Sequence, residues 1–153
     1  MSRLEWRGGV RVGRDERYFH KARQTAMLSE FPRARIGCIA VYNNKIISIG
    51  INSYKTHPVQ KIYDKYRDLK IGDGCPAHLH ALHAEIDCLL SIDDGTIDMS
   101  KVELYIYRIL KNGKKALSKP CPACRQYIID RGIRKIHYTT EDSFIEENFR
   151  GVS

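Results

Sequence analysis

Residues 36 to 52, IGCIAVYNNKIISIGIN, carry the clearest secondary-structure pattern in the chain. Two runs rich in β-branched residues flank the pair Asn43-Asn44, and asparagine tolerates the positive φ angles that a tight hairpin turn requires. The stretch therefore predicts two antiparallel strands joined by a two-residue turn, and the other expected elements can be placed on either side of this hairpin.

An amphipathic helix is expected before the hairpin, beginning at Asp15. Aromatic and small apolar residues recur at helical spacing over residues 18–27, and the pair Phe31-Pro32 follows the end of the pattern. This helix leads directly into the first strand of the hairpin.

The chain after Asn52 begins with a long polar passage that shows no clear strand. The elements expected beyond it are a short helix within 60–69, a helix from His83 to about Asp94-Gly95, a strand over 102–110, a turn at 112–115, a helix over 121–132 that stops at Gly132, and a strand over 133–140. This order of elements predicts an α/β sandwich in which helices cover one sheet.

Length and composition are those of an ordinary globular protein. The 153 residues predict a single domain over residues 1–153, with 42% hydrophobic and 29% charged residues. No apolar run reaches the roughly 20 residues that cross a bilayer, and the N-terminus lacks the apolar segment of a secretory signal, so we expect a cytoplasmic protein without a membrane partner. The net charge of +8 favours an anionic partner, although an ordinary basic protein also fits.

The five cysteines are an odd number in a chain without an export signal. That combination favours free thiols and metal ligands over a disulfide framework. Two short motifs then stand out, His83-Ala84-Glu85 and the segment PCPAC that begins at Pro120. Each motif is weak evidence alone, and their occurrence in one chain is what points to a metal site.

The two motifs suit a catalytic zinc ion. Cys121 and Cys124 are three residues apart, so both thiolates can reach one ion from the first turn of a helix, where Pro122 is tolerated. His83 adds a nitrogen ligand and leaves the fourth position for water, as in catalytic rather than structural zinc sites. Glu85 can share the site only if His83 stands at the entrance of a helix, and there it would move protons.

Less specific interpretations of both motifs stay open at this point. His83 and Glu85 can be a polar pair that caps a helix. Cys121 and Cys124 can be half of a structural zinc site or a redox pair. Glu85 argues against a closed structural site, because such a site needs no proton carrier.

Taken together, these motifs make the chain similar to the zinc-dependent cytidine and deoxycytidylate deaminase superfamily, which includes the tRNA adenosine deaminases. The resemblance extends over most of the chain, including SEFPRARIGCIAVYNNKIISIGIN. It implies a three-layer α-β-α sandwich with a central mixed sheet of about five strands. It also implies one catalytic zinc ion held by His83, Cys121 and Cys124, with Glu85 as the proton shuttle.

The resemblance also implies a reaction and a pocket. Water replaces the amino group of a base and ammonia leaves, with the substrate in contact with Asn52, with the Ala84 backbone and with residues just before Cys121, such as Pro120. A homo-oligomer is implied as well. Two loops depart from the family pattern, SYKTHPVQKIYDKYR after Asn52 and YRILKNGKKALSKPC. Both would flank the pocket.

Three functions remain open on this basis. We favour deamination of a free cytosine nucleotide, of the deoxycytidylate or cytidine type. The alternative is a deaminase of cytosine or adenine in single-stranded nucleic acid or tRNA. A third hypothesis is a zinc-stabilised binding module without activity, and it differs in predicting no role for Glu85.

Several residues near the motifs have two interpretations. His78 and His80 can form a second, structural zinc site with Cys75 and Cys38. We favour the alternative, that both histidines lie in a loop before the helix, solvated or hydrogen-bonded near the substrate, because the four residues lack a compact ligand spacing. Cys88 is expected to point into the core.

A nucleotide phosphate could be bound by Lys55 and His57 together with Arg108, or these residues could lie on an ordinary solvated surface. Tyr105 and Tyr107 share one face of a strand, and we expect that face to pack in the core rather than to line the pocket.

Overall fold

The hairpin forms as predicted. Strand β3 (Ala34–Tyr42) pairs antiparallel with β4 (Lys45–Ile51), and the turn residues Asn43 and Asn44 have φ angles of 52° and 61°. The computed structural model describes residues 6–7, 10–11, 13–67 and 80–149.

The other elements follow the expected order with four additional strands. The helices are α1 (Arg14–Ala26), α2 (Pro58–Tyr63), α3 (Ala84–Leu90) and α4 (Pro122–Asp130), with 3-10 segments η1 (Asp64–Arg67) and η3 (Met99–Lys101). The remaining strands are β1 (Trp6–Arg7), β2 (Val10–Arg11), β5 (Glu103–Leu110), β6 (Lys115–Ala116), β7 (Lys135–Thr139) and β8 (Phe144–Asn148). The described residues contain no helix with the length and apolar character needed to cross a membrane.

The central sheet is mixed, as expected. Its strand order is β4-β3-β5-β7-β8, and the short β6 pairs with β5 as a sixth strand. Strands β5 and β7 are parallel, and the other pairs are antiparallel. β1 and β2 form a separate two-stranded sheet that was not expected from the sequence.

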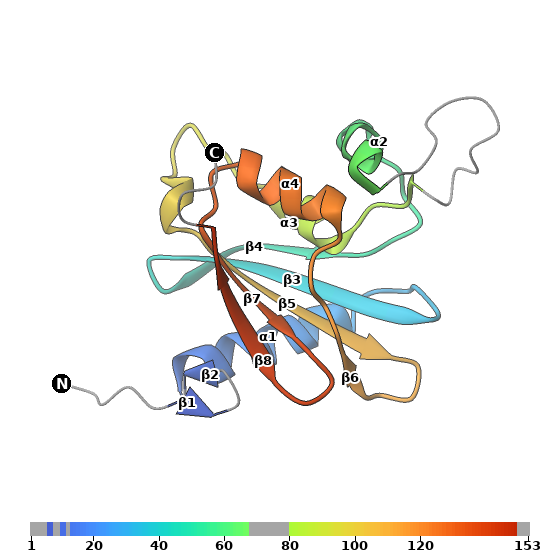
Figure 1. The fold of residues 1–153 in the computed structure, drawn as a ribbon, viewed down its shortest axis with the longest axis vertical. Helices are drawn as coiled ribbons and strands as arrows, with labels where there is room; N and C mark the ends of the chain where they lie inside the picture. The colour runs from blue at the N-terminus through green and yellow to red at the C-terminus, as the bar shows by residue number, and fades with distance from the viewer. Residues whose placement is uncertain (1–5, 8–9, 12, 68–79, 150–153) are drawn as a thin grey trace.

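Helices cover both faces of the central sheet, which confirms the three-layer sandwich (Figure 1). Helix α1 packs on one face, where Tyr18 and Phe19 meet Ile39, Val41 and Tyr105. The predicted core position of Tyr105 is therefore confirmed, since its ring is fully buried against α1.

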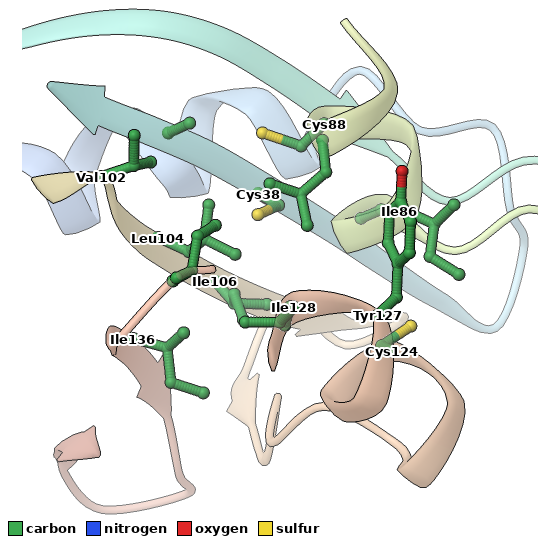
Figure 2. Packing of buried hydrophobic residues seen from close by; sticks show 14 of the residues in the cluster. Cys38, Ile86, Cys88, Val102, Leu104, Ile106, Cys124, Tyr127, Ile128 and Ile136 are labelled. Atoms are coloured by element: carbon green, nitrogen blue, oxygen red, sulfur yellow. The ribbon is translucent and has the colours of Figure 1, made fainter. Parts of the chain in front are cut away.

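The opposite face carries α3 and α4 and the larger hydrophobic core (Figure 2). Ile86 of α3 and Ile128 of α4 pack there against Leu104, Ile106 and Ile136 of the sheet. Cys88 is fully buried in the same cluster, which confirms its predicted core position.

Gly50 allows α3 to lie directly on the sheet. A Cβ atom at this position would stand 2.3 Å from both the Ala84 carbonyl oxygen and the Cys88 backbone nitrogen. Ser48 and Asp87 reinforce the contact, because the Ser48 hydroxyl donates to the Cys88 carbonyl and the Asp87 carboxylate accepts from the Ile51 N–H. The helix that follows His83 is therefore held against β4.

The prediction that the helix after His83 extends to Asp94-Gly95 is wrong. Helix α3 ends at Leu90, and the Asp93 side chain accepts a hydrogen bond from the Gly95 N–H in the turn that follows. Arg131 from the end of α4 donates to the Leu89 and Ile92 carbonyls. A side chain distant in sequence thus supplies the partners that further helical turns would have provided.

Candidate metal centre and active site

Three predicted ligands converge between the starts of α3 and α4. The His83 Nδ1 atom lies 3.2 Å from the Cys124 sulfur and 3.5 Å from the Cys121 sulfur. Among the described residues, His83, Cys121 and Cys124 form one of two groups whose ligand atoms all lie within 4.8 Å of one another. The prediction that the two motifs meet is therefore confirmed.

Local backbone geometry places each ligand. His83 is the N-cap of α3, with extended φ and ψ angles of −84° and 153°, and Glu85 follows in the first turn. Cys121 is the N-cap of α4, and Pro122 occupies the first helical position, where a missing N–H removes no hydrogen bond. Both His83 and Cys121 precede their helices. The turn of about 100° per residue in a helix therefore does not direct His83 away from Glu85, or Cys121 away from Cys124.

The ligand set fits zinc. Bonds of about 2.1 Å to nitrogen and 2.3 Å to sulfur, at a tetrahedral angle, separate the two ligand atoms by roughly 3.6 Å. The observed separations of 3.2 and 3.5 Å are close to this value. One nitrogen and two sulfur ligands are also the donor set of known catalytic zinc sites.

Electrostatics favour a thiolate at Cys121. A hydrogen bond from the Cys124 thiol lowers the pKa of Cys121 to about 4, against the effect of burial, and His83 acts in the same direction. Burial raises the pKa of Cys124, and its neighbours Cys121 and Glu85 raise it further. Burial would lower the pKa of His83, but the contact with Cys121 and the charge of Glu85 outweigh it, so the net shift is upward. A thiolate is the form in which cysteine binds metal.

Glu85 lies beside these ligands with an unused oxygen. Its side chain is 4% exposed, and within the described part of the chain its Oε1 atom is buried without a hydrogen-bond partner. Burial raises the pKa of Glu85, which favours the protonated carboxyl group more than in water. A buried carboxyl group with a raised pKa and a vacant oxygen is suited to accept and release a proton.

A pocket of about 240 Å³ opens beside His83. It is lined by Phe31, Ile36, Asn52, Arg67, Ala81, Leu82 and His83. A second pocket of about 440 Å³ adjoins it, since Phe31, Asn52 and Leu82 line both. The pocket therefore offers an aromatic ring and a guanidinium group next to His83, a predicted metal ligand.

Asn52 lies in both pockets, in a fixed orientation. Its Oδ1 atom accepts hydrogen bonds from the Ile36 N–H and the Ser29 hydroxyl, and its Nδ2 atom donates to the Ala34 carbonyl. These bonds tie the end of β4 to the start of β3. One Nδ2 hydrogen bonds to Ala34, and contact of Asn52 with a substrate stays a prediction.

The other predicted substrate contacts occupy different environments. Ala84 is fully buried at the start of α3, and Pro120 is buried just before Cys121. His57 is the N-cap of α2, where its Nδ1 atom accepts from the Val59 N–H. Lys55 lines the larger pocket. Their contact with a substrate stays a prediction.

The remaining cysteines and histidines bear on the second zinc site. Cys38 is fully buried and hydrogen-bonds Cys88 in the core, and Figure 2 shows both side chains there. His80 is buried, and its Nδ1 atom lies 2.6 Å from an Asp64 carboxylate oxygen. Cys38 and His80 thus have different partners, and the predicted positions of Cys75 and His78 lie outside the described residues.

Gln60, Asp64 and Arg67 were not identified as functional from the sequence. All three lie in the polar passage between Asn52 and His83, on α2 and η1, where a short helix was expected. The spacing of four between Gln60 and Asp64 places them on one side of a helical turn, and this was the available signal. The sequence pattern indicates for Phe31 only that it follows the first helix.

The profile of the family described as "Cytidine and deoxycytidylate deaminase zinc-binding region" matches residues 12–140. The chain belongs to this family. It is accordingly a deaminase, and the zinc-binding region of the family includes the His83, Cys121 and Cys124 cluster.

Relatives of this deaminase are distant in sequence. An uncharacterised deaminase in the luxG 3' region of Aliivibrio fischeri is 27% identical over 123 residues, which cover 80% of this chain and 69% of the relative. The crystal structure of the apo dCMP deaminase from cyanophage S-TIM5 is 23% identical, with a TM-score of 0.56 and coverage of 82% and 81% of the two chains. A cytidine deaminase from Burkholderia pseudomallei is 16% identical, with a TM-score of 0.51 and coverage of 89% and 86%. Both solved structures share the fold.

Proposed function

We propose that this deaminase hydrolyses a cytosine nucleotide, of the deoxycytidylate or cytidine type, to the uracil nucleotide and ammonia. The observation that carries the proposal is the convergence of His83, Cys121 and Cys124 beside the buried, unpartnered Oε1 atom of Glu85. A zinc ion held by the three ligands would supply the nucleophile, because zinc lowers the pKa of bound water to about 7.

Glu85 moves the protons in this proposal. Hydrolysis adds one water to the base, so one proton must reach the ring nitrogen and another must reach the departing amine. Its raised pKa means that the Glu85 carboxyl group takes up a proton more readily than a carboxylate in water does. Protonation of the Glu85 Oε1 atom disrupts no hydrogen bond to a protein group, because this atom has none among the described residues.

The pocket beside His83 supports a nucleotide as substrate. Phe31 offers an apolar ring to a base, and Arg67 offers a cation to a phosphate. Phe31 also stacks on Tyr54, with ring centroids 4.5 Å apart, so its ring is held in place. From the family resemblance we assign substrate contacts to Asn52, Ala84 and Pro120, and we assign a phosphate contact to His57 from its side-chain chemistry.

A free nucleotide is the partner that we favour over single-stranded nucleic acid. The adjoining pockets of about 240 and 440 Å³ together fall in the size range of small-molecule sites. The cyanophage S-TIM5 dCMP deaminase, which shares the fold, has been crystallised with dCMP and dUMP. We also propose one catalytic zinc ion per chain and a homo-oligomer.

The test is a substrate panel. Zinc-loaded protein is incubated with cytosine and adenine nucleosides, their nucleotides and single-stranded oligonucleotides, and products are identified by mass. We expect deamination of a cytosine mononucleotide. Failure on every free cytosine nucleotide would overturn the substrate assignment, and deamination of oligonucleotides alone would replace it with the nucleic-acid alternative.

A single substitution tests the role of Glu85. Glu85→Gln should retain zinc and the fold but lose at least about 100-fold in kcat, the usual contribution of a general acid or base. Glu141→Gln removes a carboxylate from an exposed position and serves as the control. Full activity in Glu85→Gln would refute the mechanism.

A further inference from the structure

A buried polar network from α2 and η1 reaches the start of α3, where His83 lies. It consists of Gln60 and Asp64, whose side chains are both 0% exposed, with His80 and Arg67 around them. None of these four residues is a predicted ligand of the catalytic zinc ion. Burial of a carboxylate and an amide is costly unless both are hydrogen-bonded, so their partners indicate what the network does.

The network ends on the backbone of a metal ligand. The His83 backbone N–H donates to the Gln60 Oε1 atom at 2.9 Å, and the Gln60 Nε2 atom donates to the Asp64 Oδ1 atom at 2.8 Å. Asp64 thus fixes the amide orientation in which Gln60 presents an oxygen, and not its NH₂ group, to His83.

The start of α3 explains why His83 needs an outside acceptor. The N–H of an N-cap residue has no intrahelical partner, and a Glu or Gln at the third helical position often reaches back to accept it. In α3 the third helical position is Ile86, which is fully buried in the core. Gln60 therefore supplies from α2 the acceptor that α3 itself lacks.

Asp64 connects the same network to the pocket. Its Oδ2 atom is bonded to the His80 Nδ1 atom at 2.6 Å, and its Oδ1 atom accepts from Arg67 at 3.1 Å. Arg67 lines the pocket beside His83. A buried carboxylate is unfavourable unless it is fully hydrogen-bonded, and the bonds to Gln60, Arg67 and His80 satisfy this condition.

We propose that Gln60 and Asp64 are positioning residues that fix the backbone of the metal ligand His83 and the pocket residue Arg67 in one arrangement. The inference rests on the proposed zinc-dependent function, but its consequences for metal binding can be measured without a substrate. Loss of the Gln60 acceptor should leave the His83 N–H buried and unpaired and should let the imidazole shift relative to the two sulfur atoms.

The experiment uses cobalt(II) in place of zinc, because its visible absorption bands report ligand geometry. Gln60→Met keeps a side chain of similar length and removes both hydrogen bonds. We expect shifted cobalt bands, a cobalt affinity lower by about 10-fold or more, and a fall in kcat larger than any change in KM. Affinity is measured by competition with a chelator, and urea unfolding checks the fold.

Tyr63→Phe is the matched control. Tyr63 lies on the same helix α2, and its hydroxyl donates to Asp130 of α4 at an exposed position rather than to His83. We expect this variant to keep the cobalt bands and affinity of the wild type. Equal changes in Tyr63→Phe and Gln60→Met would mean that α2 acts only as general support, which would overturn the inference.

A second set of variants keeps the inference testable if Gln60→Met does not fold. It includes a double variant in which the amide and the carboxylate exchange positions. Asp64→Asn alone should perturb the cobalt bands, whereas Q60E/D64N again places one carboxylate beside one amide and offers an acceptor to His83, so it should recover toward the wild type. No recovery, or wild-type cobalt binding in Gln60→Met, refutes the positioning role. If the variants change cobalt binding as predicted but the wild-type protein deaminates no nucleotide, the positioning role stands and the proposed function is refuted.

Discussion

Replacing Gly50 with alanine should disturb the active site through the helix that carries it. The new Cβ would stand 2.3 Å from the Ala84 carbonyl oxygen and from the Cys88 backbone nitrogen. Ordinary contact begins at about 3.4 Å, so the shortfall is 3.4 − 2.3 = 1.1 Å. Both atoms belong to the backbone of α3, so rotation of a side chain cannot relieve the clash and the helix itself must move.

The expected magnitude follows from this displacement. Overpacking of a well-packed core costs about 1–3 kcal/mol, which corresponds to a Tm lower by roughly 2–12 °C for a chain of this length. The larger effect falls on catalysis, because His83 and Glu85 move with α3. A misplacement of about 1 Å can reduce the rate by about 100-fold.

Gly37 provides a control with the same clash on the other face of the sheet. A Cβ at Gly37 would lie 2.3 Å from the Ala26 backbone nitrogen and 2.6 Å from the Ala22 carbonyl oxygen of α1. Thermal unfolding and steady-state kinetics are measured for both alanine variants. Both should lose stability, and only Gly50→Ala should lose kcat and cobalt affinity in its folded fraction. Equal activity losses in the two variants would refute the reasoning.

Two further predictions concern stability. Burial would raise the pKa of Glu103, but hydrogen bonds from His137 and Arg14 lower it to about 2 from an ordinary 4.5. After solvent screening is allowed for, this carboxylate contributes about 2 kcal/mol, which is complete above pH 4.5 and is lost as the pH falls toward 2. Urea midpoints measured across this range should fall steeply for the wild type and less for Glu103→Gln, and parallel curves would contradict the assignment. Arg131→Met removes the donors to the Leu89 and Ile92 carbonyls at the end of α3. The free energy of unfolding in urea should fall by about 2 kcal/mol, with little change in KM. An unchanged urea midpoint would mean that water replaces the arginine.

The elements predicted correctly are those whose signals are local. The turn at Asn43-Asn44 is fixed by two residues that tolerate positive φ, and the strands beside it follow. The ligand positions were predicted because an N-cap histidine and a Cys-Pro-x-Cys first turn impose their own geometry. In each case the residues that decide the structure are neighbours in the sequence.

The elements that were missed depend on distant partners. Strand β8 has the sequence FIEEN, which lacks a regular alternation of apolar and polar residues, and it forms because β7 offers an edge. The end of α3 at Leu90 depends on Arg131, which follows 41 residues later in the sequence. The spacing of Gln60 and Asp64 was visible in the sequence, but the contact of Gln60 with His83 was not, because its partner there is a backbone N–H.

The sheet topology explains how two half-sites far apart in sequence come together. Strands β5 and β7 are parallel, so the chain between them must cross over one face of the sheet, and α4 is part of that crossover. Helix α3 packs on β3 and β4 on the same face, in contact with α4 (Figure 1). The meeting of His83 with Cys121 is therefore a consequence of strand order, which the whole chain determines. The precise orientation of His83, in contrast, depends on a single acceptor at Gln60, which is why a one-residue change there should alter the metal centre while the fold persists.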